Sequence, residues 1–277
     1  MSRKSPEHGS TGVAQALAVF LLLFTAITVY IFVAKWWWFP PAITVEGHEF
    51  DAQFFRTLII TGVVFVGAQL GLALAIYRFR EQGKPARYFE GHTGMEILWT
   101  LATLVLFIGL GIYAEKAWAE VHFIGASPGA LPIEVTAQQF AWNFRYAGPD
   151  GRFGRTKPEL VSASTGNPVG IDPADPDGKD DIVSPGELAI PAGREVDLTL
   201  KSLDVTHGFY VRELRLRQDA VPGMEIHLHF RADDPGTYEL ACGQLCGLGH
   251  YKMRATVKVL SEPDFEKWMQ QQEAANQ

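Results

Sequence analysis

The chain has 277 residues, enough for one or two domains, and 47% of them are hydrophobic. Its formal net charge is -7 at pH 7, and the part from residue 115 onward, with 24 acidic and 16 basic residues, has a net charge of -8. A surface of this sign repels nucleic acid, so no nucleic-acid partner is expected. It either steers a basic protein partner or is simply a solvated surface.

Three long uncharged runs lie near the N-terminus, at residues 13–34, 57–77 and 97–114. A helix that crosses a bilayer needs about 20 apolar residues. We therefore predict transmembrane helices at about 13–34, 57–77 and 95–115, within a membrane anchor of residues 1–118.

The first run could instead be the core of a cleaved signal peptide, because Arg3 and Lys4 precede it. It is long for a signal core, however, and no Ala-x-Ala cleavage site follows it. Lys35 and three Trp residues at 36–38 come next, and such a cluster is typical of the belt at a membrane surface. The pattern favours a retained helix.

The loop between the second and third runs carries four basic residues, Arg78, Arg80, Lys84 and Arg87. The positive-inside rule places this loop and the N-terminus in the cytoplasm. Everything after the third helix then lies outside, in a bacterial periplasm or its equivalent. We expect a multi-pass protein of the bacterial inner membrane with a periplasmic C-terminal domain.

From residue 131 onward, short alternating segments are typical of strands. We predict strands at 133–137, 140–146, 187–190, 195–201, 208–211, 225–230, 236–241 and 254–260, with a long Gly-, Pro- and Asp-rich loop at 152–186. Many short strands indicate an all-β sandwich or barrel over residues 131–260. The tail, residues 261–277, begins with a predicted helix capped by Ser261.

One short segment concentrates potential metal ligands: Cys242, Cys246, His250 and Met253. His207, farther upstream, offers a second imidazole. Thiolate and thioether sulfur select copper, and imidazole suits it as well. Two Cys, two His and one Met are what a dinuclear copper centre with two bridging thiolates needs.

Three other interpretations account for fewer of these residues. A disulfide between the two cysteines suits an oxidising compartment, but it leaves His250 and Met253 without a role. A zinc site is disfavoured because Met is a poor zinc ligand. A mononuclear blue-copper site uses one Cys, so the second would be idle.

The segment resembles the copper loop of subunit II of haem-copper oxidases, Cys-x-Glu-x-Cys-x-x-x-His-x-x-Met, with a further His upstream in Asp-Val-x-His. The resemblance implies a cupredoxin-like fold and a dinuclear copper A centre. This chain departs at Gln244, where most members have Glu. The family uses the backbone carbonyl there as a copper ligand, which Gln can supply. The Glu side chain also helps to hold magnesium, and Gln is a poorer cation ligand, so magnesium is not expected.

The resemblance also implies roles for the individual ligands. Cys242 and Cys246 would bridge two copper ions, and His207 and His250 would bind one each. Met253 would be a weak axial ligand to one copper, and the Gln244 carbonyl would serve the other.

Two further segments carry the same resemblance. The aromatic segment that passes electrons inward aligns with Phe140 and Trp142, with Phe140 in place of the exposed Trp of the family. Both could instead be core residues of an alternating strand. The family's carboxylate at the mouth of a proton pathway aligns with Glu96, which could also be an ordinary interfacial group near a helix start.

The resemblance as a whole implies the subunit at which electrons enter a respiratory oxidase. It would accept them from cytochrome c or another periplasmic donor and pass them to haem in subunit I, where oxygen reduction drives proton pumping. Subunit III or other membrane subunits would complete the complex. Two alternatives stay open: the copper A subunit of a nitric oxide reductase of the same superfamily, and a membrane-anchored copper-delivery protein.

Overall fold

The computed structural model describes residues 7–82, 85 and 88–276. Four basic residues used in the topology prediction, Arg3, Lys4, Lys84 and Arg87, lie outside these ranges. The chain divides into two compact units. One is built from the residues up to Phe39 together with Ala52–Tyr113, and the other from Pro40–Asp51 together with the residues from Ala114 onward.

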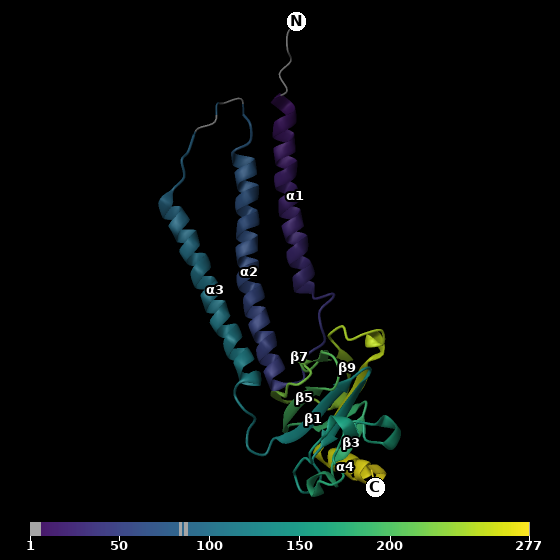
Figure 1. Ribbon diagram of the computed structural model, residues 1–277. Helices are drawn as coiled ribbons and strands as arrows, with labels where there is room; N and C mark the ends of the chain where they lie inside the picture. Colours follow the sequence, from purple (N-terminus) through teal and green to yellow (C-terminus); the bar gives the residue numbers. More distant parts are fainter. Residues whose placement is uncertain (1–6, 83–84, 86–87, 277) are drawn as a thin grey trace. The chain divides into compact units, whose positions relative to one another are not determined.

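Three long helices lie in the first part of the chain: α1 (Glu7–Ala34), α2 (Val45–Arg78) and α3 (Thr93–His122) (Figure 1). Each is long and apolar enough to cross a membrane, which confirms the three predicted membrane-type helices. The helices α2 and α3 extend well beyond their apolar runs. At the start of α2, the hydroxyl of Thr44 accepts a hydrogen bond from the amide of Gly47 at 2.9 Å. Hydropathy detects the apolar part of such a helix and not the polar turns that continue it.

The rest of the chain forms two five-stranded sheets, with strand orders β3-β2-β1-β5-β8 and β4-β10-β9-β6-β7. The pairs β1–β5 and β4–β10 are parallel, and all other neighbours are antiparallel. The strands are β1 (Leu131–Gln138), β2 (Ala141–Tyr146), β3 (Ile182–Pro185), β4 (Glu187–Pro191), β5 (Glu195–Ser202), β6 (His207–Val211), β7 (Leu216–Ala220), β8 (Ile226–Arg231), β9 (Gly236–Cys242) and β10 (Arg254–Leu260). This confirms the predicted all-β domain.

Alternating side chains of the two sheets form one apolar core. On β5, Val196, Leu198 and Leu200 are fully buried, while the two residues between them are only partly buried. The same alternation on β10 buries Val257. The large aromatic side chains of Phe144 and Phe209, from β2 and β6, fill the space between the sheets. Burial of this apolar surface is the main force that holds the two sheets together.

Two strands, β3 and β7, are missing from the sequence prediction. Both are edge strands. The first is only Ile-Val-Ser-Pro and follows a segment rich in Gly, Pro and Asp, so it was expected to be loop. The second, Leu-Arg-Gln-Asp-Ala, is polar, and an edge strand needs little apolar patterning because it packs against one neighbour. Short 3-10 turns at Pro158–Leu160, Ala163–Thr165 and Pro176–Gly178 interrupt the predicted loop.

The long connection between β2 and β3 is held against the sheet by Arg145. This side chain is 2% exposed, although it points away from the core. Its guanidinium donates to the carbonyl of Gly154 at 2.9 Å and lies 3.3 Å from Asp181. It also forms an ion pair with Glu134 on β1. The connection therefore buries a charge that a two-sheet pattern alone would leave exposed.

The helix α4 (Glu262–Asn276) follows β10 directly, and the hydroxyl of Ser261 accepts a hydrogen bond from the amide of Asp264 at its start. Trp268 of α4 packs edge-on against Tyr146, with ring centroids 5.2 Å apart. Figure 1 shows α4 at one end of the β-domain and the loop between β9 and β10 at the other. The potential metal ligands of that loop therefore lie far from the chain's C-terminal helix.

Candidate metal centre

His207 is the first residue of β6 and is fully buried. Its Nε2 donates a hydrogen bond to Asp204 at 2.8 Å, and its Nδ1 lies 4.0 Å from the sulfur of Cys242. Burial alone would raise the pKa of Asp204, but hydrogen bonds from His207 and from the amides of Gln139 and Val205 lower it. The ionised carboxylate thus holds the proton on Nε2 and leaves Nδ1 free to bind a metal.

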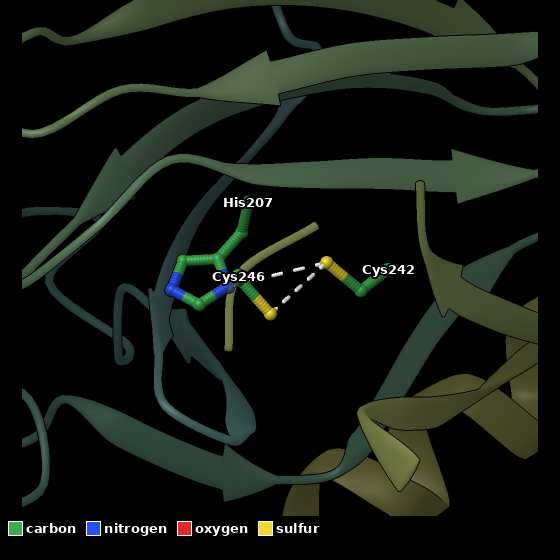
Figure 2. A group of neighbouring side chains, drawn as sticks. All are labelled: His207, Cys242 and Cys246. Carbon is green, nitrogen blue, oxygen red and sulfur yellow. Dashed lines mark hydrogen bonds between the residues drawn. The ribbon is translucent and has the colours of Figure 1, made fainter. Parts of the chain in front are cut away.

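The two cysteines point toward each other and toward His207 (Figure 2). Cys242 ends β9, Cys246 lies in the loop that follows, and their sulfur atoms are 3.7 Å apart without a disulfide bond. A metal–thiolate bond is about 2.3 Å long. Two sulfurs at this separation can therefore share the same metal ions.

Three more groups of the loop surround the sulfur atoms. The Sδ of Met253 is 3.8 Å and the Nδ1 of His250 is 3.6 Å from the sulfur of Cys246. The carbonyl of Gln244 lies 3.1 Å from the sulfur of Cys242. All six predicted ligand groups thus lie around one point in the fold.

Burial, followed by the neighbouring Cys242, raises the pKa of Cys246 to about 11. A thiolate at this position needs a compensating positive charge, which a bound metal ion would supply. Among the described residues, His207, Cys242 and Cys246 make the one group of three His, Cys or carboxylate side chains close enough to hold a metal ion. The soft donors of this group suit copper.

The backbone of the loop is held closely on both sides. A Cβ at Gly208 would lie 2.8 Å from the amide nitrogen of Gln244, so the strand β6 approaches the loop as closely as glycine allows. The side chain of Gln139 donates to the carbonyl of Cys246 at 2.6 Å. These contacts come from two different sheets, so the geometry of the loop depends on the whole β-domain.

Phe140 and Trp142 lie in different surroundings. Phe140 is 40% exposed, in the turn between β1 and β2, and its ring packs so closely on Gly249 that a Cβ there would be 2.4 Å away. Trp142 is fully buried, and its ring centroid is 6.1 Å from that of His207. The first residue therefore connects solvent with the loop, and the second packs behind a potential ligand.

Glu96 belongs to the other compact unit, in the first turn of α3, where its side chain is exposed. It is not a member of the metal-ligating group, whose residues belong to the β-domain. Two residues that contact the ligand loop, Arg217 and Gln139, were not identified from the sequence, because no local motif distinguishes them. Arg217 donates to the carbonyl of Gly243 at 3.2 Å and to the side-chain oxygen of Gln244 at 3.4 Å. The guanidinium thus places a positive charge beside Gln244, which disfavours a magnesium ion there.

Comparison with known proteins decides the family. The "alternative cytochrome c oxidase subunit 2" of Bradyrhizobium diazoefficiens is 36% identical over 262 residues, which cover 93% of this chain and 92% of that protein. The chain belongs to the cytochrome c oxidase subunit 2 family. The cytochrome c oxidase subunit 2 of Cereibacter sphaeroides is 27% identical over 77% of this chain and 73% of its own length. The family resemblance inferred from the copper motif is confirmed.

The fold agrees with this assignment. A family model described as a cupredoxin-like domain matches residues 177–258 of this subunit 2 chain. Among solved structures, the periplasmic domain of subunit II of a cytochrome oxidase of Bradyrhizobium japonicum aligns with a TM-score of 0.40 and 24% identity, over 55% of this chain and 100% of that one. The predicted combination of three apolar helices and a cupredoxin-like domain is confirmed.

Membership of the subunit 2 family makes this chain part of a haem-copper oxidase, a multi-subunit oxidoreductase. Its three apolar helices fit a membrane protein. Family membership also favours an oxidase subunit over the copper-delivery alternative, and the His and Cys residues of the β-domain are compatible with copper binding.

Proposed function

We propose that this chain accepts electrons from a donor protein outside the membrane, at a dinuclear copper centre, and passes them to haem in subunit I. The observation that carries the proposal is the grouping of His207, Cys242 and Cys246, whose ligand atoms lie within 4.8 Å of one another, with Met253 3.8 Å from the sulfur of Cys246. Two sulfur atoms 3.7 Å apart can both bond to the same metal ions, because a metal–thiolate bond is about 2.3 Å long.

Each ligand would contribute a distinct contact to the copper pair. Cys242 and Cys246 would hold both ions through their thiolates, and His207 and His250 would each contribute a ring nitrogen. Met253 and the carbonyl of Gln244 would be weaker ligands. When bound, the copper pair supplies a site that gains and loses one electron with little change in structure.

The protein around the ligands would keep them rigid. Asp204 orients the ring of His207, and Gln139 holds the carbonyl of Cys246. The first contact is local to the start of β6, and the second joins two segments that are far apart in the chain, so the ligands would keep their positions when the charge of the site changes. Phe140, exposed on one side and packed on the loop on the other, would carry electrons inward, while Trp142 supports His207 from the core.

The remaining parts of the chain would serve the complex. Residues 1–118 would anchor it in the inner membrane of a bacterium, residues 131–260 would form the periplasmic copper domain, and residues 261–277 the C-terminal helix and tail. Glu96, at the cytoplasmic start of α3, would take up protons for subunit I. Oxygen reduction and proton pumping would occur in subunit I, with subunit III or other membrane subunits completing the assembly.

The experiment that tests the proposal is turnover of the purified complex with reduced cytochrome c, with oxygen and nitric oxide offered in separate runs. Rapid oxygen consumption supports the terminal oxidase. Rapid nitric oxide consumption with slow oxygen uptake would assign the copper domain to a nitric oxide reductase instead. Failure of the complex to oxidise any reduced donor would reject the proposed role in electron transfer.

A further inference from the structure

Arg217 lies on the edge strand β7, and its side chain reaches the start of the loop between β9 and β10. One nitrogen of its guanidinium, Nη2, faces three oxygen atoms. These are the carbonyl of Gly243 at 3.2 Å, the side-chain oxygen of Gln244 at 3.4 Å and the carboxylate of Asp219 at 3.5 Å. A single cationic group is therefore bonded to both of the residues that follow Cys242.

The neighbouring strand β6 holds the backbone of the same two residues. The amide of Gly243 donates to the carbonyl of Gly208 at 2.8 Å, and a Cβ at Gly208 would lie 2.8 Å from the amide nitrogen of Gln244. A Cβ at Gly243 would in turn lie 3.4 Å from the Nε of Arg217. The segment is thus packed against β6 through its backbone and bonded to Arg217 through its oxygen atoms.

These contacts limit the position of the Gln244 carbonyl, which is one of the proposed weak ligands. Its oxygen lies 3.1 Å from the sulfur of Cys242. Because the preceding carbonyl and the side chain of Gln244 are both held, rotation about one backbone bond, ψ of Gln244, is left to aim this oxygen. Arg217 therefore acts on the ligand through Gly243 and the side chain of Gln244, without being a ligand itself.

The guanidinium also places a positive charge beside the site. A copper pair that gains an electron becomes more negative, so a fixed positive charge nearby stabilises its reduced form. The side chain of Arg217 is 52% exposed and that of Asp219, its partner, is 34% exposed. Water and the carboxylate both weaken the effect of the charge, so it should be modest.

We propose that Arg217 is a positioning residue of the copper centre, which aims the Gln244 carbonyl and raises the reduction potential of the centre. This inference rests on the proposed function and deepens it, because it names a residue that controls the same site from outside the ligand set. The two effects are separable, since one depends on the shape of the guanidinium and the other on its charge.

Arg217→Gln removes the charge and shortens the side chain. In the purified oxidase it should lower the equilibrium constant for reduction of the copper centre about three- to tenfold. Tenfold corresponds to about 59 mV for one electron. A redox titration followed by the near-infrared absorbance of copper measures the change.

Arg194→Gln is the matched control for the loss of charge. Arg194 is 41% exposed and lies 3.5 Å from Glu262 at the start of α4. That end of the β-domain is opposite to the loop between β9 and β10 (Figure 1). The control removes the same charge from a comparably exposed side chain, and it should leave the potential of the copper centre unchanged.

Arg217→Lys separates position from charge. Lysine keeps the positive charge on a flexible stem, without the planar guanidinium that Gly243 and Asp219 hold. The equilibrium constant for reduction should stay within about twofold of the unaltered value. The copper hyperfine pattern in electron paramagnetic resonance should nevertheless change, because the Gln244 carbonyl loses its fixed direction.

Gln244→Met tests the side-chain contact and leaves the backbone carbonyl in place. Methionine has a similar length but no oxygen that can accept from Arg217. The hyperfine pattern should change as it does in Arg217→Lys. The double variant should show little further change, because both substitutions break the same contact.

Three results overturn the inference. The first is a potential that moves no more in Arg217→Gln than in Arg194→Gln. The second is an unchanged hyperfine pattern in Arg217→Lys, and the third is an additive change in its double variant with Gln244→Met. If Arg217→Gln loses copper relative to haem, Arg217→Lys and the double variant decide the inference. A normal copper signal in the unaltered oxidase leaves the proposed function intact in each case, whereas its absence would reject that function.

Discussion

His207 donates a hydrogen bond from Nε2 to Asp204, and this single 2.8 Å contact turns its Nδ1 toward the sulfur of Cys242. The carboxylate comes from three residues earlier in the chain, just before β6. It is held in place in turn by the amides of Gln139 and Val205. A residue that binds no metal thus sets the direction from which His207 can bind one.

We expect Asp204→Asn to lower copper affinity by about 10- to 100-fold, because the ring of His207 loses the charged acceptor that fixes its tautomer. Competition with a copper chelator, followed by the absorbance of the centre, measures the change. Asp197→Asn, on the outward face of β5, is the matched control and should have no effect. Unchanged affinity in Asp204→Asn would show that the loop ligands alone position the imidazole.

Cys246→Ser should abolish the mixed-valence copper spectrum, because two ions cannot be bridged symmetrically by one thiolate. The β-domain should still fold, since the exchange is nearly isosteric and the core residues are untouched. Electron paramagnetic resonance of the copper-loaded chain reports the spectrum, and circular dichroism reports the fold. Met253→Leu is a useful comparison, because a weak axial ligand can be lost without loss of the copper pair. A normal spectrum in Cys246→Ser would contradict the bridging assignment.

Gly249→Ala should destabilise the β-domain by about 1–3 kcal/mol, because the new Cβ would lie 2.4 Å from the ring of Phe140. Urea unfolding of the full chain measures this loss. Gly125→Ala, where a Cβ meets nothing within 4 Å, is the control. The double variant Gly249→Ala, Phe140→Ala should recover part of the lost stability. If it does not, the tight contact between ring and loop is not the cause.

Asp181 should make the free energy of unfolding fall as pH rises from about 4 to 6. Burial raises its pKa to about 6, against the lowering effects of Arg145 and of the amide of Gly154, while Glu134 and Asp180 raise it further. Because the folded state holds this proton more tightly than the unfolded state, the contribution is complete below the unfolded pKa and is lost as pH rises through the folded one. Urea unfolding at several pH values, compared with Asp181→Asn, isolates the effect. An identical slope in the variant would rule out Asp181 as its source.

The sequence alone determined the three apolar helices and the all-β character of the second part, and it predicted the group of potential copper ligands. These features depend on local order: a bilayer sets a minimum apolar length, a sheet imposes alternation, and Cys242, Cys246, His250 and Met253 are separated by only a few residues. The family resemblance put Phe140 at the position of an exposed Trp, with Trp142 two residues later. The alternating pattern could not decide whether Phe140 meets solvent, because that depends on how the turn between β1 and β2 packs.

Only the tertiary structure decided the contacts between distant segments. Gln139 reaches the carbonyl of Cys246, and Arg217 reaches Gln244, across long stretches of chain that no local pattern connects. The buried guanidinium of Arg145 is held by Gly154 and Asp181 of the β2–β3 connection, a segment for which the composition predicted only a loop. Hydrogen bonds and ion pairs of this kind depend on distances of a few ångströms, and those are set when the two sheets pack around their core.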